Sequence, residues 1–78
     1  MTRYFFDIHD GDRITVDVEG LELPDIEAAQ EEAALSLAEM IRNRLWDEPV
    51  VRMAIHVRDA GGLIVEARFF WEMRHIRQ

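Results

Sequence analysis

The sequence predicts a small α+β domain of order ββαββ, in which one amphipathic helix packs on one face of a four-stranded antiparallel sheet. Two stretches of alternating apolar and polar residues precede a long stretch with helical spacing, and two further alternating stretches follow it. A turn sequence separates the two members of each alternating pair. The 78 residues suffice for one domain, which we assign to residues 1–78.

The first pair of strands is predicted within residues 3–18. Strand one, residues 3–9, directs one set of side chains towards the helix: Tyr4, Phe6 and Ile8. Its other side chains face away from the helix: Phe5, Asp7 and His9. The Asp10-Gly11 turn that follows is a strong hairpin signal, because glycine tolerates a positive φ. Strand two, residues 13–18, is expected to bury three side chains: Ile14, Val16 and Val18.

The helix is predicted over residues 26–46. Asp25 begins it, because an aspartate at this position accepts hydrogen bonds from the free amides of the first turn. Apolar residues spaced three and four apart form one stripe: Ile26, Ala29, Ala33, Leu37, Met40 and Ile41. Pro49 prevents its continuation. A helix of about 31 Å is expected to overrun strands of about 26 Å and to leave Trp46 uncovered.

The second pair of strands is predicted over residues 50–58 and 63–70, joined by a turn at 59–62. The side chains expected to face the helix are Val51, Met53, Ile55, Val57, Leu63, Val65, Ala67 and Phe69. Those expected on the opposite face are Arg52, Ala54, His56, Arg58, Ile64, Glu66, Arg68 and Phe70. Residues 72–78 form a polar tail that is expected to fray.

Strand directions restrict the topology to two antiparallel orders, if strands are numbered along the chain. The order 2-1-3-4 places the apolar first strand in the middle of the sheet, and it is the preferred order. The order 1-2-4-3 stays open.

Composition excludes several classes of function. The formal net charge of −7 disfavours non-specific binding to nucleic acids, which are also anionic. The absence of cysteine removes disulfides, thiolate metal sites and cysteine nucleophiles. No apolar stretch approaches the roughly 20 residues of a membrane span, and the N-terminus lacks the pattern of a signal peptide. We therefore expect a cytoplasmic protein without a membrane partner.

Several short motifs resemble those of a known family. They are the Arg3-Tyr4-Phe5-Phe6 opening, the Asp10-Gly11 turn, the stretch from Glu19 to Asp25 with Glu27-Ala28-Ala29, and Asp59-Ala60-Gly61-Gly62. Together they resemble a family of short bacterial proteins classed as a domain of unknown function. The resemblance covers nearly the whole chain and implies a bacterial, stand-alone domain. It implies no activity.

No catalytic, cofactor or metal site is predicted. Asp7, His9 and His56 share a face if strands one and three are neighbours, but no histidine spacing supports a metal site. Ser36, the single serine, lies within the predicted helix without an evident base. We expect a protein that is not an enzyme and needs no cofactor.

The predicted functional surface is either the uncovered face of the sheet or the end of the molecule that carries the tryptophans. The candidate interface residues are large, apolar and outside the shelter of the helix: Phe5, Trp46, Ile64, Phe70 and Trp71. They favour a protein-interaction domain that forms a homodimer or binds another protein. The alternative is a small regulatory nucleic-acid-binding domain that uses arginines and an aromatic ring on this face: Arg52, Arg58, Arg68 and Phe5.

Overall fold

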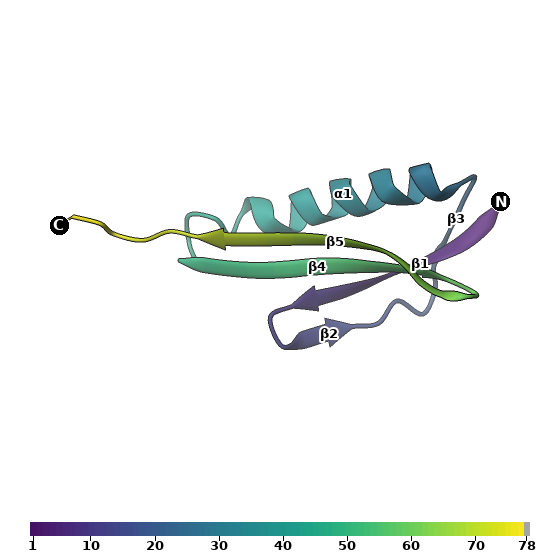
Figure 1. Ribbon diagram of the computed structural model, residues 1–78, viewed down its shortest axis with the longest axis horizontal. Coiled ribbons are helices and arrows are strands. Elements are labelled where there is room, and N and C mark those ends of the chain that lie inside the picture. The colour runs from purple at the N-terminus through teal and green to yellow at the C-terminus, as the bar shows by residue number, and fades with distance from the viewer. Residues whose placement is uncertain (78) are drawn as a thin grey trace.

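A computed structural model describes residues 1–77 as one helix on one side of a five-stranded sheet (Figure 1). The strands are β1 (Thr2–Asp10), β2 (Arg13–Thr15), β3 (Leu21–Leu23), β4 (Val50–Asp59) and β5 (Gly62–Glu72). The helix, α1, spans Ile26–Arg42. The predicted α+β class is confirmed.

All strand pairs in the sheet are antiparallel, and four strands follow the order β2-β1-β4-β5. This is the preferred order 2-1-3-4 of the four predicted strands. The short strand β3 was not predicted, and it pairs with the first residues of β1, Thr2–Tyr4.

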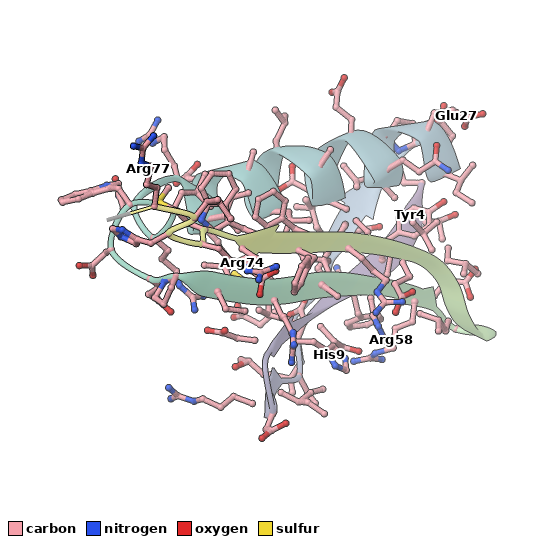
Figure 2. The ribbon with its side chains drawn as sticks, turned by 60° about the vertical axis from the view of Figure 1, so that its left-hand side comes forward. Tyr4, His9, Glu27, Arg58, Arg74 and Arg77 are labelled. Atoms are coloured by element: carbon pink, nitrogen blue, oxygen red, sulfur yellow. The ribbon has the colours of Figure 1, made fainter. Side chains whose placement is uncertain are left out.

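The core lies between α1 and the face of the sheet that it covers. Asp25 caps the helix as predicted, because its carboxylate accepts a hydrogen bond of 2.9 Å from the Ala28 N–H. The buried core residues come from β1, α1 and β4: Tyr4, Ala29, Ala33, Leu37, Ile41, Val51, Met53, Ile55 and Val57. In Figure 2, Tyr4 points towards the helix, whereas His9 and Arg58 lie on the other side of the sheet.

The helix ends at Arg42, four residues before the predicted end. Residues 43–48 turn instead, because the Arg44 N–H bonds to the Ile41 carbonyl and the Arg44 guanidinium binds the carboxylates of Glu48 and Asp10. The 17-residue helix is about 26 Å long and the 11-residue β5 about 36 Å. The predicted overrun is therefore wrong, although Trp46 is exposed as expected.

Strand β2 is shorter than predicted, and its side chains point the other way. Gly11 and Asp12 form a two-residue turn, so Arg13 pairs with Asp10 and Ile14 pairs with His9. Because paired residues point to the same side, Ile14 lies on the face that α1 does not cover. The predicted burial of Ile14, Val16 and Val18 is wrong: all three are exposed.

Strand β5 continues two residues beyond its predicted end, which changes the position of Trp71. This side chain is partly buried against the core that α1 covers and pairs with the buried Val51, so the prediction that it lies outside the shelter of the helix is wrong. At the other end of β5, a register shift between Val57 and Arg58 brings Leu63 opposite Arg58. Leu63 is consequently exposed rather than buried.

Candidate interaction surface on the open face

We call the side of the sheet away from α1 the open face. β1 contributes Phe5, Asp7 and His9 to it, and β2 contributes Ile14. β4 contributes Arg52, Ala54, His56 and Arg58. β5 contributes Leu63 and Ile64 at the register shift, and then Glu66, Arg68 and Phe70. The alternation predicted in β1, β4 and β5 brings these residues together. Neither Trp46, in the turn after α1, nor Trp71 belongs to this surface.

Arg58 anchors one end of the open face. Its guanidinium donates hydrogen bonds to the Asp7 carboxylate, the shorter of 2.8 Å, and one of 2.8 Å to the Asp17 carbonyl. These bonds fix residues 16–20 over the sheet. The hydrogen bond from Arg58 lowers the pKa of Asp7 below its ordinary value, although burial opposes this shift.

Phe5 lies beneath this loop rather than in open solvent. The Arg58 guanidinium carbon is 4.6 Å from the centre of the Phe5 ring, and the backbone of Gly20 packs against the ring edge. Phe5 and Arg58 thus make a cation–π contact within the chain. Two of the four residues in the nucleic-acid prediction are engaged within the protein.

The centre of the open face carries two stacked imidazole rings. The ring centroids of His9 and His56 are 3.9 Å apart, and His56 Nε2 lies 2.7 Å from the Glu66 carboxylate. Asp7 bonds to Arg58 instead of turning towards these rings. Within residues 1–77, no group of three or more metal-binding side chains is arranged to hold a metal ion.

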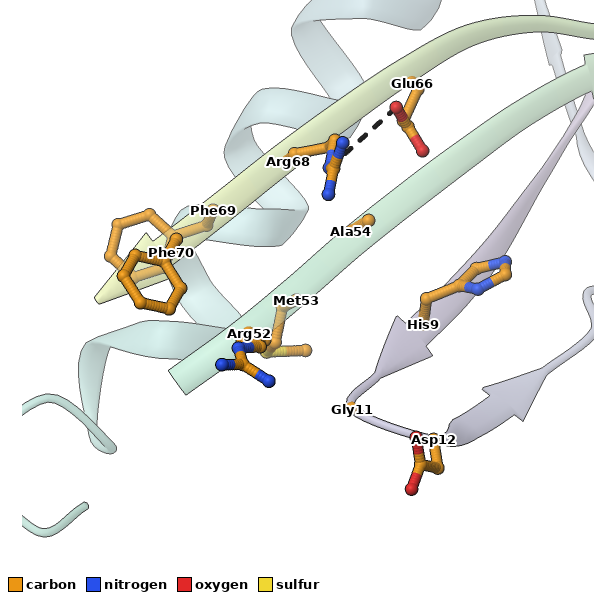
Figure 3. Close-up of a pocket in the computed structure, with 10 residues that line it drawn as sticks. All are labelled: His9, Gly11, Asp12, Arg52, Met53, Ala54, Glu66, Arg68, Phe69 and Phe70. Atoms are coloured by element: carbon orange, nitrogen blue, oxygen red, sulfur yellow. Dashed lines mark ion pairs between the residues drawn. The ribbon is translucent and has the colours of Figure 1, made fainter. Parts of the chain in front are cut away.

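A shallow pocket of about 560 Å³ lies between the β1–β2 turn and β5 (Figure 3). Its floor is the small Ala54, flanked by His9 on β1 and Arg68 on β5. Arg52 lies over the Phe70 ring, 5.5 Å from its centre. The pocket therefore offers an aromatic ring, cations and the Asp12 and Glu66 carboxylates, which suits a mixed polar and apolar contact.

Exposed apolar side chains lie in this pocket and near it: Phe70 lines it, Ile14 pairs with His9 of the lining, and Ile64 lies two residues before Glu66 of the lining. Phe70 is 59% exposed, Ile14 60% and Ile64 39%. Ile14 is the member that the sequence interpretation missed, and the two-residue Gly11-Asp12 turn was the signal that would have placed it here. Apolar side chains next to arginine are typical of protein interfaces.

The fold and this surface define a class: small α+β domains with one helix on an antiparallel sheet whose second face is uncovered. The chain belongs to the family described as Domain of unknown function (DUF6894), whose model matches residues 3–70. The resemblance predicted from the short motifs is thus confirmed. No match was found among curated proteins or solved structures. Within residues 1–77, no helix has the length and apolar character that a membrane crossing requires.

Proposed function

We propose that this protein is a non-enzymatic interaction domain of the bacterial cytoplasm that forms a homodimer through the open face and the β5 side of its sheet. The observation that carries the proposal is the group of exposed apolar side chains Ile14, Ile64 and Phe70 on the side of the sheet away from α1. Burying them would remove apolar surface from water, which is the main favourable term in protein association.

Charged and polar groups of this surface support the same proposal. Arg58 is already paired with the Asp7 carboxylate, and His56 Nε2 already lies 2.7 Å from the Glu66 carboxylate, so a partner need not supply a polar group to either side chain. Arg52 and Phe70 form an arginine–aromatic pair, a combination enriched in the energetically important centres of interfaces.

The substitution Phe70→Ser tests the proposal. We expect it to weaken the homodimer at least tenfold, because truncating an aromatic anchor at an interface centre costs about 2 kcal/mol or more. Leu35→Ser is the matched control, since Leu35 is 63% exposed but lies on α1, in the other layer of the molecule. Equal dissociation constants for the two variants in sedimentation velocity would contradict the proposal.

Single-stranded nucleic acid is the second candidate ligand, because two exposed arginines lie near the Phe70 ring: Arg52 opposite it on β4, and Arg68 two residues before it on β5. Asp12 and Glu66 in the same pocket oppose a phosphate, which makes this candidate the weaker one. It predicts binding of a short single-stranded RNA or DNA that falls steeply with added salt and is lost in Arg52→Gln/Arg68→Gln. No binding at low salt would remove it.

A further inference from the structure

We infer that two copies of the chain join edge to edge, with β5 of one copy antiparallel to β5 of the other around a two-fold axis at Ala67. The inference rests on the proposed homodimer and names its contact along β5, which involves Ile64 and Phe70 and leaves Ile14, on β2 at the other end of the sheet, uncovered. β5 lies at an edge of the sheet, where β4 is the strand that pairs with it in the described residues. An edge strand of 11 residues presents a row of free backbone N–H and C=O groups to a further strand.

The opposite end of the sheet cannot provide an equivalent contact. β2, at that end, has three residues, and the loop that follows it folds back over the open face. A two-fold homodimer uses the same surface patch on both copies. The long free edge of β5 is therefore the one suited to self-pairing by strands.

The charges of β5 select one register. A two-fold axis perpendicular to the sheet places one residue of β5 opposite its own copy. With Ala67 on the axis, Glu66 lies opposite the partner's Arg68, and Arg68 lies opposite the partner's Glu66, so two ion pairs form across the interface. Arg68 can reach this contact, because its side chain is 77% exposed and its ion pair with Glu66 of its own chain is long, at 3.9 Å. Glu66 Oε2 already lies 2.7 Å from His56 Nε2, so Oε1 is the oxygen that would face the partner's Arg68.

The apolar residues of β5 fit the same register. On the helix-covered face, Val65 lies opposite the partner's Phe69. At the next position on the open face, Ile64 comes beside the partner's Phe70, so two of the exposed apolar side chains of each copy meet. The contact thus contains matched charges at its centre and apolar pairs on both sides.

Neighbouring registers are less favourable. An axis at Glu66 or at Arg68 places two like charges directly opposite each other, which is destabilising. An axis at Phe69 places Glu66 opposite the partner's Glu72. An axis at Val65 leaves both Glu66 and Arg68 opposite uncharged residues. Among these registers, only the one centred on Ala67 pairs both charges.

The helices are compatible with this arrangement. α1 packs on β4 and β5, so strands about 4.8 Å apart would hold the two helices about 10 to 14 Å from each other. Helices in contact are usually separated by 8–10 Å. Ser36, Glu39 and Met40 line a pocket with Phe6 and Ile8 of β1. At 100° per residue, the exposed Ala34 and Ala38 then lie towards β5, and these small side chains leave room for the partner's helix.

Charge reversal tests the register. We expect Glu66→Arg alone and Arg68→Glu alone each to weaken the homodimer at least about tenfold, because two attractive pairs become repulsive. An equimolar mixture of the two single variants is expected to form a heterodimer, since both contacts then pair Arg with Glu. The double variant E66R/R68E is expected to recover the homodimer. Native mass spectrometry and sedimentation velocity measure these species, and thermal melts confirm that each variant is folded.

Matched controls separate the register from a general effect of charge. Glu72→Arg and Arg74→Glu make the same changes at positions without a charged partner in this register. Glu66→Arg changes the net charge from −7 to −5, so general repulsion alone would strengthen the dimer rather than weaken it. If the wild type dimerises and the single variants match their controls, the β5 register is wrong and the proposed homodimer stands. A monomeric wild type would overturn both.

Discussion

Asp17 holds the loop between β2 and β3 on the sheet. Its carboxylate accepts hydrogen bonds of 3.0–3.1 Å from the backbone N–H groups of Phe6, Glu19 and Gly20. Burial raises the pKa of Asp17, but these donors and the Arg58 charge lower it more, so its pKa lies below the ordinary value of 3.8. The folded protein therefore prefers the ionised carboxylate.

Acid is expected to destabilise the protein through the carboxylates of Asp17 and Asp7. Both carboxylates have a folded-state pKa below the unfolded value, so their contribution is present above about pH 4 and is lost as pH falls through the folded pKa. Urea unfolding at pH values from about 6 to about 2 measures the loss in free energy of unfolding. In Asp17→Asn the dependence on pH is expected to be shallower; an unchanged slope would contradict this role.

Gly20 is required by the same loop for two reasons. Its φ of +75° disfavours other residues, and an added Cβ would lie 2.9 Å from Arg3 Cγ and from Phe5 Cε1. We expect Gly20→Ala to lower the free energy of unfolding by about 2–3 kcal/mol. Gly11 is the control, because its φ is +60° but a Cβ there meets no atom within 4 Å.

The difference in unfolding free energy between Gly20→Ala and Gly11→Ala isolates the effect of the close approach of the loop to Phe5. Gly11→Ala is expected to cost about 1 kcal/mol, which reflects backbone conformation alone. Chemical denaturation of both variants measures the difference. Equal losses in the two variants would show that the contact between Gly20 and Phe5 contributes nothing.

Among the secondary-structure elements, the N-terminal cap of α1 is the simplest feature to test. The Asp25 carboxylate accepts the Ala28 N–H, one of four amides that lack a partner within the helix. Asp25→Ala is expected to lower the free energy of unfolding by about 1 kcal/mol, and Asp25→Ser to retain most of it. Thermal unfolding with circular dichroism detects this change, since 1 kcal/mol shifts Tm by about 4–8 °C in a small domain. Equal Tm values for both variants would contradict the cap.

Local sequence patterns predicted most elements, but they did not predict where α1 ends or to which side the residues of β2 point. Alternation placed Tyr4, Phe6 and Ile8 against the helix because the period of a strand is fixed at two residues. The end of α1 depends on Arg44 binding Asp10, which is 34 residues away in the chain, so no local pattern reports it. In β2, the two-residue turn fixed the register and overrode the apolar alternation that begins at Ile14.

The candidate surface was predictable to the same extent. Alternation identified Arg52, Phe70 and Glu66 as residues of the uncovered face. It did not reveal that Arg58 and Phe5 are covered, because the loop containing Asp17 reaches them from 41 and 12 residues away along the chain. Contacts between distant segments therefore decided which members of the predicted face remain exposed.

At the scale of the whole molecule, the described chain is long and thin, 54 × 22 × 17 Å, with one helix over one face of the sheet. A domain of this size buries only roughly 60% of the surface that its unfolded chain exposes, so its core supplies little surplus stability. Self-association would bury apolar side chains, such as Phe70 and Ile64, that the monomer leaves exposed. The fold and the proposed function are consistent in this respect.

Sedimentation equilibrium of the wild-type chain measures self-association without any substitution. The apparent mass is expected to rise from 9.2 kDa towards twice that value as the concentration increases from about 1 μM to about 1 mM. A folded protein that keeps the mass of one chain over this whole range would contradict the proposed homodimer.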